Sequence, residues 1–142
     1  MTSRMTAAEA NALLQQAFSA HSPRTEVTVM EEGRAVIRLE ADESNLRPGN
    51  YISGPTQMSL VDTAAYMAVM TLTGENPMAV TSNLNINFLR PCIGEVVVAD
   101  AKIMKIGQAL AVMDVDVRIE GAAKAASHAI VTYALPRKDA AA

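Results

Sequence analysis

Asp62 is the residue whose surroundings most clearly suggest chemistry, because it is the only charged side chain between Asn50 and Gly74. A carboxylate among apolar neighbours is costly to bury and usually has a partner or a task. At helical spacing, Asp62 shares one face with Met58 and Ala65. Such a carboxylate could act as a general base. Alternatively, it could face an oligomer interface and form a hydrogen bond there.

The dipeptide Gly54-Pro55 fits the start of a helix that would carry Asp62. The first turn of a helix offers free backbone N–H groups and a partial positive charge. These groups can stabilise the oxyanion that develops on an acyl carbonyl. Because proline has no N–H, Gly54 would be the donor. An ordinary helix start without any further role is the alternative.

One long helix is predicted to position both groups, over Pro55–Thr73. Gly74 suits a helix C-cap, and Pro77 prevents the helix from continuing. The segment is apolar on nearly every side, so we expect other elements to cover it. The preceding segment, 41–54, is polar and longer than most connections, and loops of this length are often functional.

The rest of the chain is predicted to be one helix and two groups of strands. Thr6 and Glu9 have the spacing of a capping box, which indicates a helix near Thr6–Ser19. Thr25–Met30 and Ala35–Leu39 flank a turn and are typical of a hairpin. Four more strands are expected after the long helix: Val80–Leu89, Val96–Lys105, Leu110–Ile119 and Ala125–Leu135.

This order of elements predicts an α+β fold in which an antiparallel sheet wraps around one long central helix. Alternation is clearest in the first strand after that helix. There Leu84, Ile86 and Phe88 would face one way. The asparagines between them, Asn83, Asn85 and Asn87, would face the other.

Two segments resemble the hotdog-fold acyl-CoA thioesterases, in particular their phenylacetate-pathway (PaaI-like) type. Residues 53–64 are similar to that family's signature of His-Gly-Gly, six residues, Asp, a variable residue and Ala. Residues 80–91 resemble its strand after the helix, and Gly107 resembles its glycine between the next two strands. The resemblance covers 27–135. It implies one hotdog thioesterase-like domain over 1–142, with an N-terminal helix within 1–22 and a frayed tail at 137–142.

The resemblance also implies an activity, the hydrolysis of an acyl-CoA thioester to a free acid and CoA. Asp62 matches the carboxylate that activates water or attacks the thioester. Gly54 matches the residue whose backbone N–H polarises the thioester carbonyl, and Thr81 falls where relatives place a hydroxyl that helps to position the water. In this family the site lies at a dimer interface, so a homodimer or a homotetramer built from two dimers is expected.

This chain departs from the family pattern at several positions near the predicted site. Ser53 replaces the family's histidine and Pro55 its second glycine, while Arg47 stands where relatives use a loop asparagine. Asn45 and Asn50 stand on either side of Arg47, and Asn50 could replace that amide if the loop follows a different path. Ser53 could offer a hydroxyl to the substrate. These departures leave open a second function, a non-catalytic module that binds acyl-CoA or an acyl carrier. A hotdog dehydratase is a third, but no histidine and acid pair is found near Asp62.

Further candidates are weaker. Arg90 follows an apolar strand and could bind a CoA phosphate, although a solvated charge at a strand end is the simpler interpretation. Met58, together with other methionines, could line a flexible acyl pocket or be ordinary core. His128 and His21 have no paired metal ligand. Cys92 has no histidine nearby in the sequence, so a nucleophilic role is not expected.

Composition excludes several classes of function. The formal net charge is −3, and the two Phe, three Tyr and no Trp offer few stacking surfaces, so a nucleic-acid partner is not expected. The longest apolar segment is interrupted by polar side chains, so we expect no membrane span. No metal site, phosphate loop or dinucleotide fingerprint is found, and no cofactor is expected. The single cysteine excludes an internal disulfide, and a soluble, cytoplasmic protein is expected.

Overall fold

The long helix α2 (Gly54–Thr73) is the element around which the computed structural model is built, and residues 2–17 and 24–136 are described. Its N-cap is Ser53, whose side chain accepts a hydrogen bond from the Thr56 N–H. Gly74 ends the helix at φ 74°, a conformation that glycine adopts without strain. The helix begins one residue before the predicted Pro55, because Gly54 already has helical geometry.

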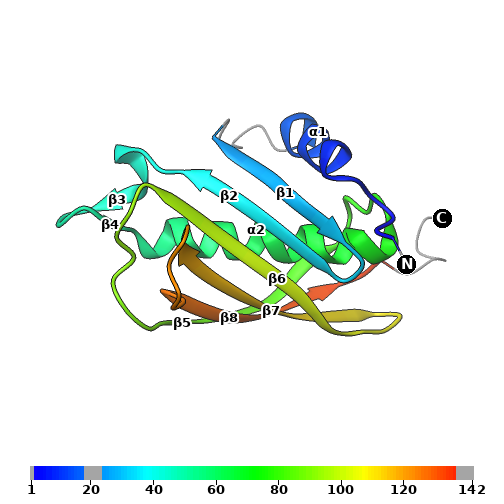
Figure 1. The fold of residues 1–142 in the computed structure, drawn as a ribbon. Helices are drawn as coiled ribbons and strands as arrows, with labels where there is room; N and C mark the ends of the chain where they lie inside the picture. The colour runs from blue at the N-terminus through cyan, green and yellow to red at the C-terminus, as the bar shows by residue number, and fades with distance from the viewer. Residues whose placement is uncertain (1, 18–23, 137–142) are drawn as a thin grey trace.

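The sheet has six strands in the order β1-β2-β6-β7-β8-β5, and every neighbouring pair is antiparallel. Figure 1 shows the sheet curving around α2, which lies along its inner face. The predicted strands are confirmed, with ends that differ by one or two residues. Their bounds are β1 Thr25–Glu31, β2 Arg34–Glu40, β5 Val80–Phe88, β6 Val96–Ile106, β7 Leu110–Ile119 and β8 Ser127–Ala134.

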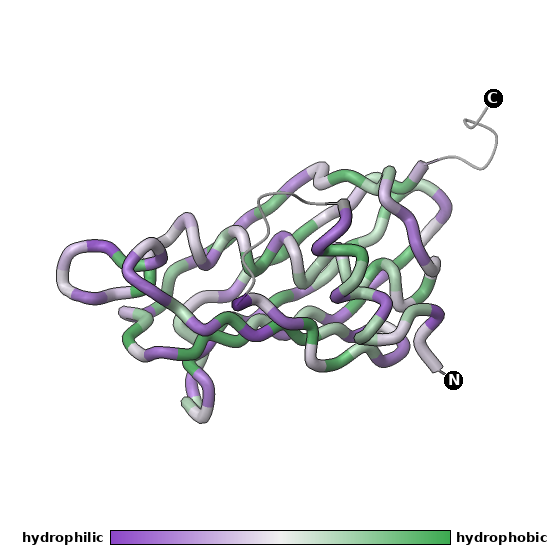
Figure 2. The backbone as a smooth tube through the Cα atoms, turned by 90° about the horizontal axis from the view of Figure 1, so that it is seen from above, coloured by the Kyte–Doolittle hydropathy of each residue, from purple (hydrophilic) through white to green (hydrophobic). Residues whose placement is uncertain are grey.

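The core lies between α2 and the inner face of the sheet. Inward positions on β7 and β8, such as Val115, Val117 and Val131, are fully buried, and their neighbours along each strand are not. Figure 2 shows this alternation of hydrophobic and hydrophilic residues along the backbone. The prediction that α2 is covered by other elements is confirmed. Its buried residues are Gln57, Leu60, Val61, Ala64, Ala65, Tyr66, Met67, Ala68, Val69, Met70 and Thr71.

Helix α1 (Ala7–Ala17) protects one edge of the sheet. The predicted capping box is present, since the Glu9 N–H donates to Thr6 Oγ1 and the Thr6 N–H donates to Glu9 Oε1. Asn11 satisfies both backbone groups of Val27 on the edge strand β1, at 2.8 and 3.1 Å. The predicted extension of this helix to Ser19 and the predicted frayed tail lie outside the described residues.

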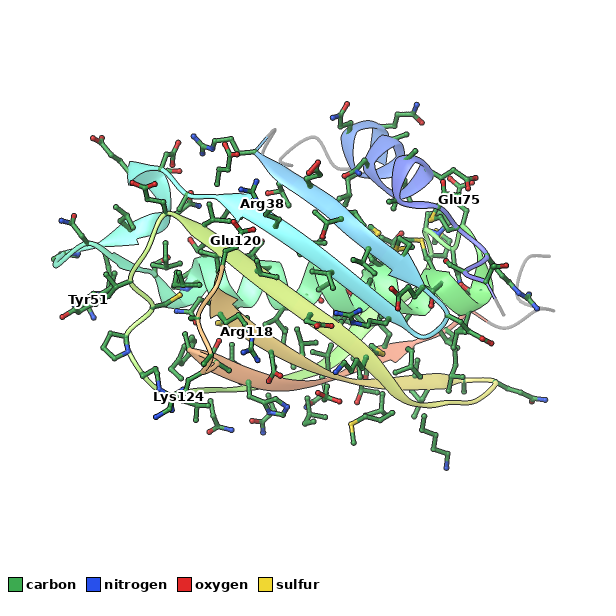
Figure 3. The ribbon with its side chains drawn as sticks, in the orientation of Figure 1. Arg38, Tyr51, Glu75, Arg118, Glu120 and Lys124 are labelled. Carbon is green, nitrogen blue, oxygen red and sulfur yellow. The ribbon has the colours of Figure 1, made fainter. Side chains whose placement is uncertain are left out.

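The segment before α2 is ordered, which corrects the expectation of one long polar loop. It contains a 3-10 turn (η1, Glu43–Asn45) and two short paired strands, β3 (Leu46–Arg47) and β4 (Tyr51–Ile52). Buried Gln57 anchors this segment because its Nε2 donates to the Ile52 carbonyl at 3.2 Å. Ser127 on β8 donates in turn to Gln57 Oε1 at 2.8 Å. Figure 3 shows Tyr51 at this end of the molecule, far from Glu75 beyond the other end of α2.

Candidate active site

A cavity of about 770 Å³ opens beside α2, where α1, β1, η1 and the beginning of β5 approach the helix. Asp62 lies on its wall and is half-buried. The other charged residue of the lining is Arg24, which forms an ion pair with Asp42. Apolar side chains make up much of the remaining wall. They are Leu14, Leu39, Pro55, Leu60, Pro77, Ala79 and Val80.

Two hydroxyl groups donate hydrogen bonds to one oxygen of the Asp62 carboxylate. Thr81 Oγ1 lies 2.6 Å from Asp62 Oδ1, and the phenol of Tyr133 lies 2.8 Å from the same atom. The phenol also lies 3.0 Å from the main-chain carbonyl oxygen of Asp62. No described residue donates a hydrogen bond to Oδ2. One carboxylate oxygen is therefore held, and the other has no donor among the described residues.

A β-bulge explains how Thr81 reaches Asp62. The pairing of β5 with β8 shifts by one residue between Thr81 and Asn83, so Ser82 is the extra residue. Without this bulge, strict alternation would place Thr81 on the outer face with the exposed Asn83 and Asn85. With the bulge, Thr81 pairs with Tyr133 and shares the inward face. Bulges next to active sites often redirect a side chain in this way.

Tyr133 is a functional candidate that the sequence reasoning missed. Its side chain is only 4% exposed, and its ring stacks on that of Tyr66 with centroids 5.9 Å apart. Burial and, next, the Asp62 carboxylate raise the pKa of Tyr133 far above its usual range, so the phenol remains a proton donor. Burial also raises the pKa of Tyr66. A tyrosine among small and aliphatic inward positions of a strand was an available signal, because a buried phenol needs a partner.

Gly54 occupies the first position of α2, as the sequence predicts. Among the described residues, none accepts a hydrogen bond from its backbone N–H. The next two N–H groups of the helix already have acceptors. The Thr56 N–H donates to Ser53 Oγ, and the Gln57 N–H donates to the Ser53 carbonyl. A Cβ atom at Gly54 would lie 3.3 Å from the ring of Phe88. The Gly54 N–H is therefore the donor that α2 offers to a ligand.

Gly54 and Asp62 of one chain are too far apart to act on one carbonyl group. Eight residues separate them on α2, which corresponds to about 12 Å at 1.5 Å per residue. A donor to a carbonyl oxygen and a base that acts at its carbon each lie about 3 Å from the group. A site that uses both residues would therefore need two copies of the chain.

The sequence profile of the Thioesterase superfamily matches residues 49–126, which is more than half of the chain and includes α2 and the strand that carries Thr81. This chain belongs to the Thioesterase superfamily.

Individual proteins support this membership and the predicted resemblance. A predicted esterase of Thermoplasma acidophilum is 30% identical over 112 residues, which are 79% of this chain and 83% of that protein. The crystal structure of a predicted thioesterase from Silicibacter sp. TM1040 is 27% identical with a TM-score of 0.85, over 96% of this chain and 95% of that one. The PaaI protein of the E. coli phenylacetic acid degradation operon shares the fold, with 23% identity and a TM-score of 0.71 over 89% of this chain and 90% of that one. The six-stranded sheet and its helix are therefore the hotdog fold of this superfamily.

The remaining predicted residues of this thioesterase fold lie outside the cavity lining. Ser53 is the N-cap of α2, and its hydroxyl donates to Thr56 Oγ1 at 2.9 Å. Asn50 occupies a turn position with φ 60°, where its N–H donates to the Arg47 carbonyl. Met58 is 42% exposed on α2 and does not belong to the core.

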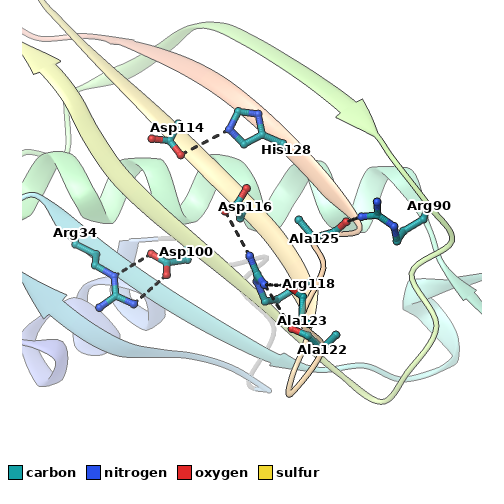
Figure 4. A network of polar contacts seen from close by, with 10 residues as sticks. All are labelled: Arg34, Arg90, Asp100, Asp114, Asp116, Arg118, Ala122, Ala123, Ala125 and His128. Atoms are coloured by element: carbon teal, nitrogen blue, oxygen red, sulfur yellow. Dashed lines mark hydrogen bonds and ion pairs between the residues drawn. The ribbon is translucent and has the colours of Figure 1, made fainter.

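The charged and titratable candidates Arg90, His128 and Cys92 have contacts that do not include Asp62. Figure 4 shows Arg90 donating to the Ala125 carbonyl and His128 facing Asp114, whose Oδ1 lies 3.6 Å from His128 Nε2. Cys92 is buried, and burial raises the pKa of its thiol to about 11, which agrees with the expectation that it is not a nucleophile. His21 lies outside the described residues.

The described part of the chain shows neither a cluster of metal ligands nor a helix that could span a membrane. There, no three His, Cys, Asp or Glu side chains come together as a metal site would require. None of the helices in residues 2–17 and 24–136 has the length and apolar character needed to cross a membrane.

Proposed function

We propose that this chain hydrolyses an acyl-CoA thioester to a free acid and CoA, with Asp62 as the central catalytic group. The observation that carries the proposal is the Asp62 carboxylate on the cavity wall, with Oδ1 held by two hydroxyls and Oδ2 without a donor among the described residues. Membership of the Thioesterase superfamily supports hydrolysis of a thioester in general. The acyl-CoA substrate and the residue roles are our proposal.

In this mechanism Asp62 Oδ2 takes a proton from a water molecule, and the water oxygen bonds to the thioester carbon. The carbonyl oxygen becomes an oxyanion, which the Gly54 N–H of a second copy of the chain stabilises. The C–S bond then breaks, the acid is released, and the CoA thiolate recovers the proton from Asp62. Direct attack by Oδ2, followed by hydrolysis of the acyl-aspartate, would use the same groups. Thr81 holds the carboxylate and, as the resemblance implies, helps to position the water.

We further propose that the working unit is a homodimer, alone or in a dimer of dimers, with each site shared between two subunits. The helical rise of about 12 Å between Gly54 and Asp62 motivates this, because Gly54 of one subunit could meet Asp62 of its partner. The outer edge of β5 is unpaired within the described residues, whereas Asn11 covers β1 at the other edge. Large apolar side chains are exposed on and around β5. They are Met58, Met78, Val80, Phe88 and Leu89.

The substrate would lie along this shared surface. We propose that the acyl group enters the cavity, whose wall is largely apolar, and that the CoA part follows the surface near α2. Asn50, Ser53, Met58 and Arg90 are the proposed substrate contacts, with Arg90 facing a phosphate. The chain's single cysteine, Cys92, accords with a reducing compartment, and we propose a cytoplasmic location.

A second candidate function is an acyl-CoA or acyl-carrier binding module without turnover. The observation in its favour is Ser53, which replaces the family's histidine and whose hydroxyl is engaged in the N-cap of α2.

Thiol release from a panel of short, medium and aromatic acyl-CoAs tests the proposal. We expect turnover by the wild type and a loss of about 10²-fold or more in Asp62→Asn, as for an essential base. Both proteins must give the same circular dichroism spectrum. An inactive wild type across the panel, or an Asp62→Asn variant with the wild-type rate, would support the binding module instead.

A further inference from the structure

Tyr133 is a buried residue of the cavity lining to which the proposed mechanism assigns no step. Its phenol has a single proton, and two acceptors on Asp62 lie within reach, Oδ1 at 2.8 Å and the main-chain oxygen at 3.0 Å. The phenol therefore contacts both the side chain and the backbone of one residue. A buried phenol needs a partner, and here the partner is the carboxylate on the cavity wall.

We propose that Tyr133 is a positioning residue for Asp62, which together with Thr81 holds Oδ1 so that Oδ2 is the oxygen that reacts. This inference rests on the proposed thioester hydrolysis. Tyr133 lies on β8 and Thr81 on β5, so two strands fix a carboxylate that a third element, α2, supplies.

The surroundings keep the phenol of Tyr133 in place. Its ring stacks on that of Tyr66, which belongs to α2 itself, at an interplanar angle of 24°. Its strand is paired on both sides, with β7 and with β5. A carboxylate on a helix surface can otherwise rotate about its side-chain bonds. With both donors present, rotation would break two hydrogen bonds, so Oδ2 stays directed at the reactant.

The two donors also separate the roles of the carboxylate oxygens. Oδ1 carries the part of the negative charge that the two hydroxyls stabilise. Oδ2 keeps its lone pairs for the proton of water or for the thioester carbon. Because burial raises the pKa of Tyr133, the phenol keeps its proton near neutral pH and remains a donor to Oδ1.

Steady-state kinetics of Tyr133→Phe test the inference, after Asp62→Asn has established that turnover depends on the carboxylate. We expect kcat to fall about 10- to 100-fold while KM stays within about twofold, because reactant orientation is lost and binding is not. Tyr51→Phe is the matched control, since it removes a phenol from β4, outside the cavity lining, and its kcat should equal that of the wild type.

Thr81, the second donor to Asp62 Oδ1, gives an independent test if Tyr133→Phe folds poorly. Thr81→Val should also lower kcat, and Thr81→Ser, which keeps the hydroxyl, should recover most of it. The double variant Tyr133→Phe/Thr81→Val should lose less than the product of the single losses, because both groups act through Oδ1. A folded Tyr133→Phe with the wild-type kcat overturns the inference and leaves the proposed function intact. If Asp62→Asn itself keeps the wild-type rate, the proposed function fails first.

Discussion

Thr81 and Tyr133 are direct partners across β5 and β8, and both of their hydroxyls donate to the same oxygen of Asp62. This relationship depends on the bulge at Ser82, which brings Thr81 to the inward face of the sheet. Because the edge strand β5 contains one extra residue, its Thr81 side chain can donate a hydrogen bond to the Asp62 carboxylate on α2.

Deletion of Ser82 should leave the site active, because regular pairing would then keep Thr81 on the inward face. Without Ser82, Thr81 directly precedes the outward Asn83, and strict alternation places Thr81 opposite Tyr133. We expect kcat to stay close to the wild-type value, measured by thiol release. Ser82→Ala is the matched control, because it keeps the extra residue and should also retain the wild-type kcat. A folded deletion variant with the low kcat of Thr81→Val would contradict this register.

The proposed role of the Gly54 N–H as an oxyanion donor can be tested with two substitutions, one that keeps this N–H and one that removes it. Both Gly54→Ala and Gly54→Pro place a Cβ near Phe88, but only proline removes the N–H. Ser53, with φ −68° and ψ 155°, already has the backbone conformation that a following proline requires. We expect kcat of Gly54→Pro to fall about 10²-fold below that of Gly54→Ala, as for the loss of an oxyanion donor. Equal kcat values for the two variants would argue against this role of Gly54.

Sharing of the site between subunits predicts complementation. A mixture of Gly54→Pro and Asp62→Asn subunits, each inactive alone, should form heterodimers in which one of the two sites has both native groups. Equal mixing with free exchange should restore roughly a quarter of the wild-type activity, since half of the dimers are mixed. Thiol release is measured after the subunits have been unfolded and refolded together. Lack of any recovery, with dimers confirmed by sedimentation, would contradict a shared site.

Cys92 should make the protein less stable in alkaline solution. Burial raises the pKa of its thiol to about 11 in the folded state, so the folded protein binds this proton more tightly than the unfolded chain. Its stabilising contribution is complete below the thiol's ordinary pKa and is lost as pH rises through about 11. The free energy of unfolding, measured in urea at several alkaline pH values, should fall less steeply in Cys92→Ala. Identical slopes would contradict a buried thiol. Burial also raises the pKa values of Tyr66 and Tyr133, which lowers the free energy of unfolding at alkaline pH in the wild type and in Cys92→Ala alike.

The order and type of the main elements could be predicted because local signals were strong. Gly74 ends α2 where its left-handed conformation suits glycine, and Thr6 with Glu9 forms the predicted capping box. The segment before α2 could not be predicted in detail. Its short strands depend on Gln57, whose hydrogen bonds reach both Ile52 and the distant Ser127.

Asp62 could be found from the sequence because a single carboxylate in an uncharged helix is unusual, and Gly54 because helix starts expose N–H groups. Thr81 was indicated only by the resemblance to thioesterases. The alternation of β5 places it on the wrong face, and no local pattern marks Ser82 as a bulge. Tyr133 could not be connected to Asp62, because 71 residues separate them in the chain.

The periodicity and the caps of the helices follow from local sequence, since they depend on neighbours three or four residues away. The isolated charge at Asp62 is also visible in the sequence alone. Which oxygen of Asp62 is held depends on tertiary contacts, namely the pairing of β5 with β8 and the packing of both strands against α2. Strand register and helix packing are set by contacts between distant segments, which no local pattern contains.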